Sequence, residues 1–356
     1  MKNRKQKMLF SLIMVCLVFN SILITEIFAA TTIVIDKPQQ GQNYNDLLNQ
    51  EDIVFKFRIL GGFQTYSTFI DGQYDPILDH VGVDIYYEVN LFIGKYGRGE
   101  HTFTVTAKVS GLEPEGVIEG GRSTISKSVE FEVNPVLCHF VGFGYNDDPS
   151  LVYWQSNVLP LKDLLQEPGY AKYIPGYSYS SFWWNDDDVD DKIRELDAYE
   201  TSNDIVVVLF ASHGSDPWGI KCTYGCGFNH WLTPSELKSP LSVLESNNLI
   251  VIINACHSGI FIDKLSQLSN SHHIMTSCRD NEDSYGYGGD YDYSWTIETK
   301  IKRVGAYFPR FLFKALLEVN STFSAFLYAY AETVQTDPRQ HPQYHYNLVQ
   351  SLYLVG

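Results

Sequence analysis

Two residues with reactive side chains, a histidine and a cysteine, follow short runs of apolar residues. His213 follows the run at 205–210 and precedes Gly214, and Cys256 follows the run at 249–253. A thiol attacks a carbonyl as its thiolate, and an imidazole close to it can take the thiol proton and later protonate a leaving amine. A glycine after the histidine lets a backbone N–H approach a substrate and stabilise an oxyanion.

The two apolar runs predict the elements that position this pair. Both runs are short, continuous and rich in β-branched residues, which is typical of parallel strands buried on both faces. The carboxyl ends of parallel strands lie at one edge of a sheet, where active sites form. We therefore expect His213 and Cys256 to meet at that edge. The alternative is that Cys256 is an inert core thiol, as cysteines on apolar strands often are.

The rest of the second half of the chain alternates between strand and helix patterns. A strand is expected at 136–143 and helices around 158–165 and 189–196, with two late helices at 311–319 and 323–330. The acidic run Asn185–Asp188 fits a helix cap better than a Ca²⁺ loop, because it lacks the glycine and distal glutamate of such loops. This alternation predicts an α/β fold, a mostly parallel sheet with helices on both faces.

Residues 30–135 have a different pattern. Apolar and polar residues alternate at 53–59, 102–109 and 128–133, and glycine clusters separate the runs. A period of two predicts strands with one buried and one solvated face. We interpret this part as an all-β sandwich of the immunoglobulin-like type. It has no residue that we interpret as catalytic, so the boundary near 135 separates a spacer or adhesive module from a domain at 136–356.

The N-terminus reads as a targeting segment. Four basic residues precede an apolar run at 8–24, and small residues follow at 29–30, which predicts a signal peptide at 1–29 and a secreted protein. An uncleaved membrane anchor is the alternative; otherwise no stable membrane partner is expected. Without residues 1–29 the net charge is 22 − 41 = −19. So acidic a chain is not expected to bind nucleic acid.

Five cysteines remain after residues 1–29 are removed, and an odd number in a secreted chain suggests one free thiol. Cys222 and Cys226 lie in one short loop and are expected to form a local disulfide or to be two buried thiols. A metal site is disfavoured because no second Cys/His pair accompanies them. His257, His272, His273 and His341 are expected to be surface or structural residues, with His272 and His273 preceding a strand.

Several segments of the second half resemble the caspase/legumain clan of cysteine peptidases. The strand with its His-Gly motif and the Ala-Cys turn carry the resemblance to the clan, at Asp204–Gly214 and Asn254–Gly259. Later segments are similar to the prokaryotic, legumain-like (C13-like) branch, at 275–285, 289–295 and 340–343. The resemblance covers about residues 136–356. It implies the caspase-hemoglobinase fold.

The resemblance also implies site residues. Cys256 would be the nucleophile and His213 the acid/base, and the amides of Gly214 and Cys256 would form the oxyanion hole; no metal or organic cofactor is implied. The Arg-His pair that legumains have after the first strand is absent here, and Asn146 is the residue of that segment that would orient His213.

Asn254, Ser284 and Asp290 match positions that line the specificity pocket in the clan. A neutral amide, a hydroxyl and one carboxylate form a polar pocket, which disfavours aspartate before the scissile bond and leaves asparagine, or lysine and arginine. The sequence therefore predicts a secreted cysteine endopeptidase whose partner is a protein or peptide substrate. The alternatives are a transpeptidase or ligase of the same fold, and a non-enzymatic surface binding protein on a caspase-like scaffold.

Overall fold

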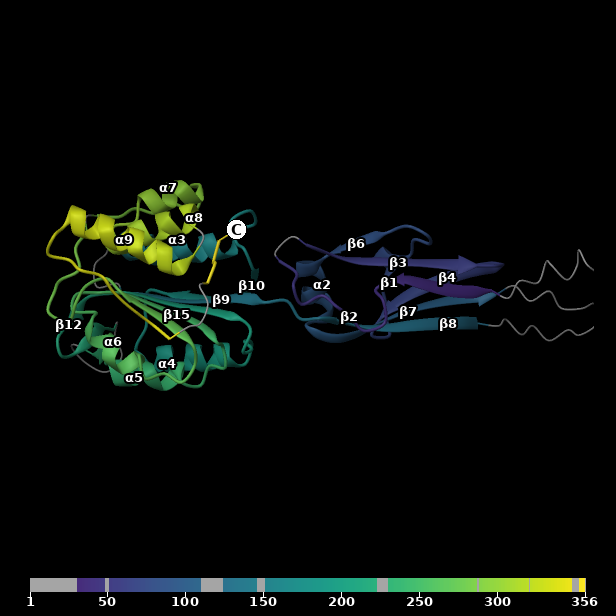
Figure 1. Cartoon of the computed structure of the whole chain (residues 1–356), viewed down its shortest axis with the longest axis horizontal. Coiled ribbons are helices and arrows are strands. Elements are labelled where there is room, and N and C mark those ends of the chain that lie inside the picture. The colour runs from purple at the N-terminus through teal and green to yellow at the C-terminus, as the bar shows by residue number, and fades with distance from the viewer. Residues whose placement is uncertain are drawn as a thin grey trace, which may run out of the picture. The chain divides into compact units, whose positions relative to one another are not determined.

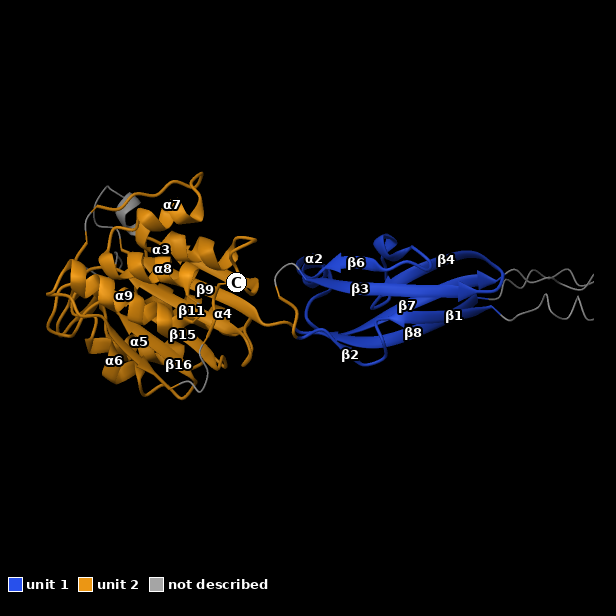
Figure 2. Cartoon of the chain, turned by 45° about the horizontal axis from the view of Figure 1, so that its top comes forward, with its two compact units in different colours: residues 1–45, 51–134 blue, residues 46–50, 135–356 orange. Residues whose placement is uncertain are grey.

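The computed structural model of the chain describes residues 31–48, 51–109, 124–145, 151–222, 230–286, 288–319, 321–347 and 352–355. The chain divides into two compact units, one formed by residues 1–45 and 51–134 and the other by 46–50 and 135–356 (Figure 2). The predicted signal peptide at 1–29 lies outside the described residues, and so do Asn146 and Cys226. Within the described part of the chain, no helix is long and apolar enough to span a bilayer.

The first unit consists mainly of two sheets. The three-stranded sheet has the order β1-β3-β6, and the five-stranded sheet has the order β2-β8-β7-β4-β5. The strands are β1 (Thr32–Lys37), β2 (Gln42–Asn43), β3 (Asp52–Leu60), β4 (Phe63–Ile70), β5 (Gln73–Tyr74), β6 (Ile85–Glu88), β7 (Gly99–Val109) and β8 (Thr124–Val133). A 3-10 turn η1 (Pro76–Leu78) and a helix α2 (Val89–Tyr96) complete the unit.

The alternating pattern of the first unit has the expected structural result. Along β3, Ile53, Phe55, Phe57 and Ile59 are buried while most intervening residues are at least partly exposed. The ring of Phe55 lies edge-on to that of Phe103 on β7, with the centroids 5.0 Å apart. The two sheets therefore bury one face each in an aromatic core, and the immunoglobulin-like assignment stays a prediction.

The second unit is built on a six-stranded sheet of order β10-β9-β11-β15-β16-β17. Its strands are β9 (Leu137–Gly144), β10 (Ile174–Ser181), β11 (Ile205–Ala211), β15 (Asn248–Asn254), β16 (His272–Thr276) and β17 (Gln343–Tyr346). The first five are parallel, and β17 runs antiparallel to β16 at one edge. A small sheet of β12 (Gly214–Ser215), β13 (Gly219–Lys221) and β14 (Trp231–Leu232) follows β11.

Helices cover both faces of this sheet (Figure 1). One face carries α3 (Leu151–Gln166), α7 (Ile297–Lys302), α8 (Tyr307–Glu318) and α9 (Thr322–Thr336). The other face carries α4 (Asp186–Asp197), α5 (Pro234–Leu241) and α6 (Ile260–Leu265). Helix α4 starts at a capping box between Asn185 and Asp188, so the acidic run caps a helix.

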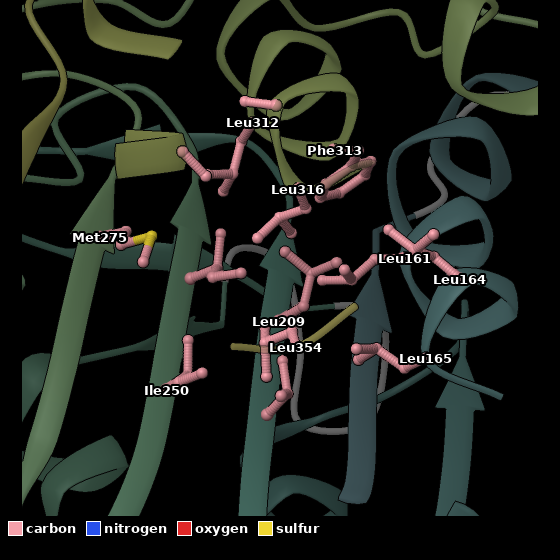
Figure 3. Close-up of a cluster of buried hydrophobic side chains, with 14 of the residues drawn as sticks. Leu161, Leu164, Leu165, Leu209, Ile250, Met275, Leu312, Phe313, Leu316 and Leu354 are labelled. Carbon is pink, nitrogen blue, oxygen red and sulfur yellow. The ribbon is translucent and has the colours of Figure 1, made fainter. Parts of the chain in front are cut away.

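The central strands are buried on both sides because their side chains alternate between two cores. Val207 and Leu209 of β11 pack toward α3 and α8, whereas Val206, Val208 and Phe210 pack toward α4 and α5. Figure 3 shows the first core, with residues of α8 above the strands and leucines of α3 to the right of strand residues such as Leu209. Fully burying one such side chain stabilises the fold by roughly 1.5–3 kcal/mol, so this double burial fixes where β11 and β15 end.

Two sequence expectations need correction. His272 and His273 were expected to precede a strand, but they are its first residues and are buried in β16. The ring of His273 hydrogen-bonds the hydroxyl of Tyr344 on the paired strand β17, which explains why a polar side chain is tolerated there.

The cysteine count was also a poor guide. The described cysteines are all free thiols: Cys138, Cys222, Cys256 and Cys278. Cys222 is buried and takes part in no disulfide. The odd number of cysteines therefore did not single out one free thiol.

Candidate active site

Hydrogen-bond register places the two candidate catalytic residues on neighbouring strand ends. Ala211 of β11 is paired with Asn254 of β15, and the N–H of Ser212 donates to the carbonyl of Asn254 at 3.0 Å. His213 and Cys256 each lie two residues beyond this pair. Because the strands are parallel and in register, both residues leave the sheet at the same edge.

The backbones beyond the strands are in direct contact. A Cβ atom placed on Gly214 would lie 1.8 Å from the carbonyl oxygen of Cys256 and 3.1 Å from the Cβ of Ala255. Only a glycine allows this approach. The His-Gly segment thus lies against the turn that contains Cys256.

His213 is exposed and lies between a hairpin and an aromatic ring. Its carbonyl accepts a hydrogen bond from Lys221 N at 2.9 Å, across the β12–β13 hairpin. The Tyr145 ring lies edge-on to the imidazole, with the centroids 5.5 Å apart. Tyr145 is itself buried, its N–H donates to Ala211 O at 2.9 Å, and Lys221 Nζ lies 4.9 Å from its ring centroid. The imidazole is therefore accessible to a substrate, while hydrogen bonding holds the His213 backbone in place.

Cys256 differs from the other described cysteines because it is only half-buried. Burial raises the pKa of Cys138 to about 12 and that of Cys278 to about 11, so both are inert at neutral pH. Partial burial and the nearby Asp283 also raise the pKa of the Cys256 thiol, while the Ser284 N–H opposes the shift by donating to Sγ at 3.3 Å. Of these thiols, Cys256 is the one a substrate can reach.

The turn after Cys256 is held in an unusual backbone conformation. His257 has a φ of 56°, in the left-handed region that residues other than glycine rarely adopt. Its N–H donates to Glu282 O at 2.7 Å, and its Nδ1 lies 2.7 Å from Asp280 O. His257 is therefore not simply a surface residue: its hydrogen bonds connect the turn after Cys256 to the loop at 278–285.

The structure brings two of the three predicted pocket residues together. Asn254 is buried, and its Oδ1 accepts a hydrogen bond from Ser284 Oγ at 3.1 Å. Asp290 is exposed; its carboxylate accepts from Tyr291 N at 2.9 Å, and its N–H donates to Arg303 O at 3.1 Å. These two hydrogen bonds of Asp290 involve neither Asn254 nor Ser284.

Sequence reasoning missed residues that reach the site from distant segments. Tyr145 and Lys221 flank His213, and the sequence offered no signal for either beyond their positions next to strand ends. His341 was expected to pack the late segment; its N–H and Nδ1 instead contact the Glu282 carboxylate, both at 2.8 Å. Asn146, the predicted orienting residue, lies outside the described residues.

No three histidine, cysteine or carboxylate side chains gather as a metal site would within the described ranges. The arrangement offers a half-buried thiol, an accessible imidazole and a close approach of the Gly214 and Cys256 backbones at one edge of a sheet. These are the parts needed for acyl transfer through a covalent thioester.

Comparison with known proteins shows what this arrangement is similar to. The model of the Peptidase C13 family matches residues 188–324, the segment with His213, Cys256 and Ser284. Among solved structures the chain is similar to caspase-1 from Spodoptera frugiperda, with 13% identity and a TM-score of 0.42 over 60% of this chain and 88% of the caspase. No curated protein matches the chain. The second unit is thus similar to the Peptidase C13 family over the segment that contains both candidate catalytic residues.

Proposed function

We propose that this protein is a secreted endopeptidase in which Cys256 is the nucleophile and His213 the acid/base. The observation that carries the proposal is the contact between the two strand ends, where Gly214 leaves no room for a Cβ beside the Cys256 carbonyl. The match of residues 188–324 to a peptidase family model supports protein or peptide substrates. Secretion enters the proposal through the basic and apolar pattern of residues 1–29.

In the first step His213 takes the proton from Sγ of Cys256, and the thiolate attacks the carbonyl carbon of the scissile bond. The carbonyl oxygen becomes an oxyanion, which the amides of Gly214 and Cys256 stabilise. His213 then donates the proton to the leaving amine, and the C–N bond breaks to give a thioester. Water, deprotonated by His213, hydrolyses the thioester and restores the thiol.

The electrostatics of the site make the imidazole necessary. Partial burial raises the pKa of Cys256, so the thiol form dominates near neutral pH. A proton acceptor must therefore act during the attack, because a neutral thiol is a weak nucleophile. The parallel register of β11 and β15 supports His213 in this role, since it leaves the sheet at the same edge as Cys256.

For the residue before the scissile bond we propose asparagine over lysine or arginine. The paired side chains of Asn254 and Ser284 are neutral and offer both donors and acceptors, which suits an amide. A cationic residue would need the Asp290 carboxylate opposite it, and the hydrogen bonds of Asp290 lead to Tyr291 and Arg303 instead. The neutral pair thus supports the amide.

Labelling with a peptidyl electrophile that has asparagine next to its reactive carbon tests the proposal. The full chain should be labelled at Cys256, and Cys256→Ala should not be labelled, because the described cysteines Cys138, Cys222 and Cys278 are buried. Peptide mapping identifies the labelled cysteine. Equal labelling of the Cys256→Ala variant, or labelling of wild type only at another cysteine, would refute the nucleophile.

A matched pair of probes tests the specificity. We expect the asparagine probe to react faster than the same probe with aspartate at that position. A faster reaction of the aspartate probe would show that Asn254 and Ser284 do not form the pocket.

A further inference from the structure

A glutamine from the C-terminal part of the chain is buried behind the nucleophile. Gln340 lies between α9 and β17, and its side chain is fully buried. Its Oε1 accepts from Tyr285 N at 2.9 Å, and its Nε2 donates to Ser277 O at 2.8 Å and approaches Ser284 Oγ at 3.4 Å. Both ends of the amide are therefore used, one as an acceptor and one as a donor.

The segments that Gln340 binds are the ones that contact the nucleophile. Ser284, next to Tyr285, donates its N–H to the sulfur of Cys256 at 3.3 Å. Ser277 exchanges hydrogen bonds with Ala255, accepting from its N–H at 3.2 Å and donating to its carbonyl at 3.1 Å. Gln340 thus contacts Ser277 and the loop at Ser284–Tyr285, and these two segments bond Ala255 and the sulfur of Cys256 in turn.

We propose that Gln340 is a positioning residue that keeps the Ser284 N–H directed at the sulfur of Cys256 and so stabilises its thiolate. The inference rests on the proposed role of Cys256 as nucleophile. A hydrogen bond to a charged acceptor is worth more than one to a neutral acceptor, so this N–H favours the thiolate over the thiol. An apolar side chain at 340 would leave the partly buried Tyr285 N–H without its acceptor, and the loop would shift.

The rate of alkylation of Cys256 by iodoacetamide reports the thiolate directly and requires no peptide cleavage. For Gln340→Met, which keeps the length of the side chain, we expect the rate at pH 7 to fall about tenfold. The matched control is Asn347→Ala: this amide also uses both its acceptor and its donor on backbone groups, His272 N at 2.6 Å and Asn270 O at 3.3 Å, but at the other end of β17. The control should alkylate within about twofold of wild type.

A second variant keeps the test decisive if Gln340→Met does not fold. In Gln340→Glu the protonated acid has the shape of the amide and can both donate and accept, whereas the carboxylate cannot donate. The ratio of variant to wild-type alkylation rates should therefore rise toward one as the pH falls through the titration of this carboxyl group. Because Glu282, Asp283, His341 and Arg339 are charged or titrate around this loop, the two proteins are compared at each pH.

The outcomes separate this inference from the proposed function. Two results would overturn the positioning role. One is alkylation of Cys256 in Gln340→Met at the wild-type rate, and the other is a ratio of Gln340→Glu to wild-type rates that does not change with pH. Slower alkylation with no peptide cleaved by wild type would support the positioning role and refute the proposed function instead. In an active enzyme the Gln340→Met change should lower kcat and leave KM nearly unchanged, because it acts on the sulfur and not on substrate binding.

Discussion

Adding one methyl group at Gly214 should disable the site without touching a reactive side chain. In Gly214→Ala the new Cβ would lie 1.8 Å from the carbonyl oxygen of Cys256, whereas real Cβ contacts essentially never fall below 3.0 Å. The two backbones must therefore separate by at least about 1.2 Å, the difference between these distances. A misplacement of about 1 Å can cost about 10²-fold in rate, and overpacking costs about 1–3 kcal/mol of stability.

The assay measures the rate constant for labelling of Cys256 by the asparagine probe, together with the melting temperature of each variant. We expect labelling by Gly214→Ala to be about 10²-fold slower while the variant stays folded at 25 °C. Gly62→Ala is the control, since a Cβ on Gly62 meets nothing within 4 Å. Near wild-type labelling by a folded Gly214→Ala protein would refute the argument that close contact of the strand ends assembles the site.

Three further predictions concern the acid/base, the pocket and stability. His213→Ala should lower kcat for a cleaved peptide by about 10²–10⁴-fold with the fold intact by circular dichroism, and a loss below tenfold would remove His213 from the mechanism. Ser284→Ala should slow cleavage of fluorogenic peptides after asparagine about fivefold, because one hydrogen bond in the pocket is lost. A larger loss of rate in Asp290→Ala, measured with the same peptides, would show that the Asp290 carboxylate is part of the pocket. Burial raises the pKa of Glu200 from 4.5 to about 7, so its contribution to stability is complete below about pH 4.5 and is lost as the pH rises through 7. Glu200→Gln keeps the acceptor for Glu245 N but stays neutral, and thermal melts should show it more stable than wild type at pH 8 and equal to it near pH 4.5.

The elements that position the site could be predicted from the sequence because burial dictates their composition. The runs at 205–210 and 249–253 are continuous and apolar, and they form β11 and β15 almost to the residue. The short helices α5, α6 and α7 were not predicted. Each has only six to eight residues, too few to show a helical period, and such helices depend on tertiary packing.

The residues of the site could be predicted where a reactive side chain directly follows a strand. His213 and Cys256 follow their strands directly, so topology alone brings them to one edge. Tyr145 and Lys221 contact His213 or its neighbours from distant segments, and a single sequence has no signal for such contacts. The segment 340–343 was part of the family resemblance, but the sequence did not indicate which residues Gln340 would contact. Asn254 and Ser284 are hydrogen-bonded to each other, whereas the specificity pocket that the resemblance implied for them and Asp290 stays a prediction.

The position of β11 and β15 in the middle of the sheet has a consequence for how the site loses its structure. Each has a paired strand on both sides, whereas β10 and β17 are the edges. Amides of central strands exchange with solvent mainly when a whole domain opens, while edge strands and termini open locally at lower free energy. The segments that lead into His213 and Cys256 should therefore be among the slowest to exchange in the second unit. Heat should then remove enzymatic activity and the central sheet in one transition, since the strand ends cannot fray apart while their neighbours stay paired.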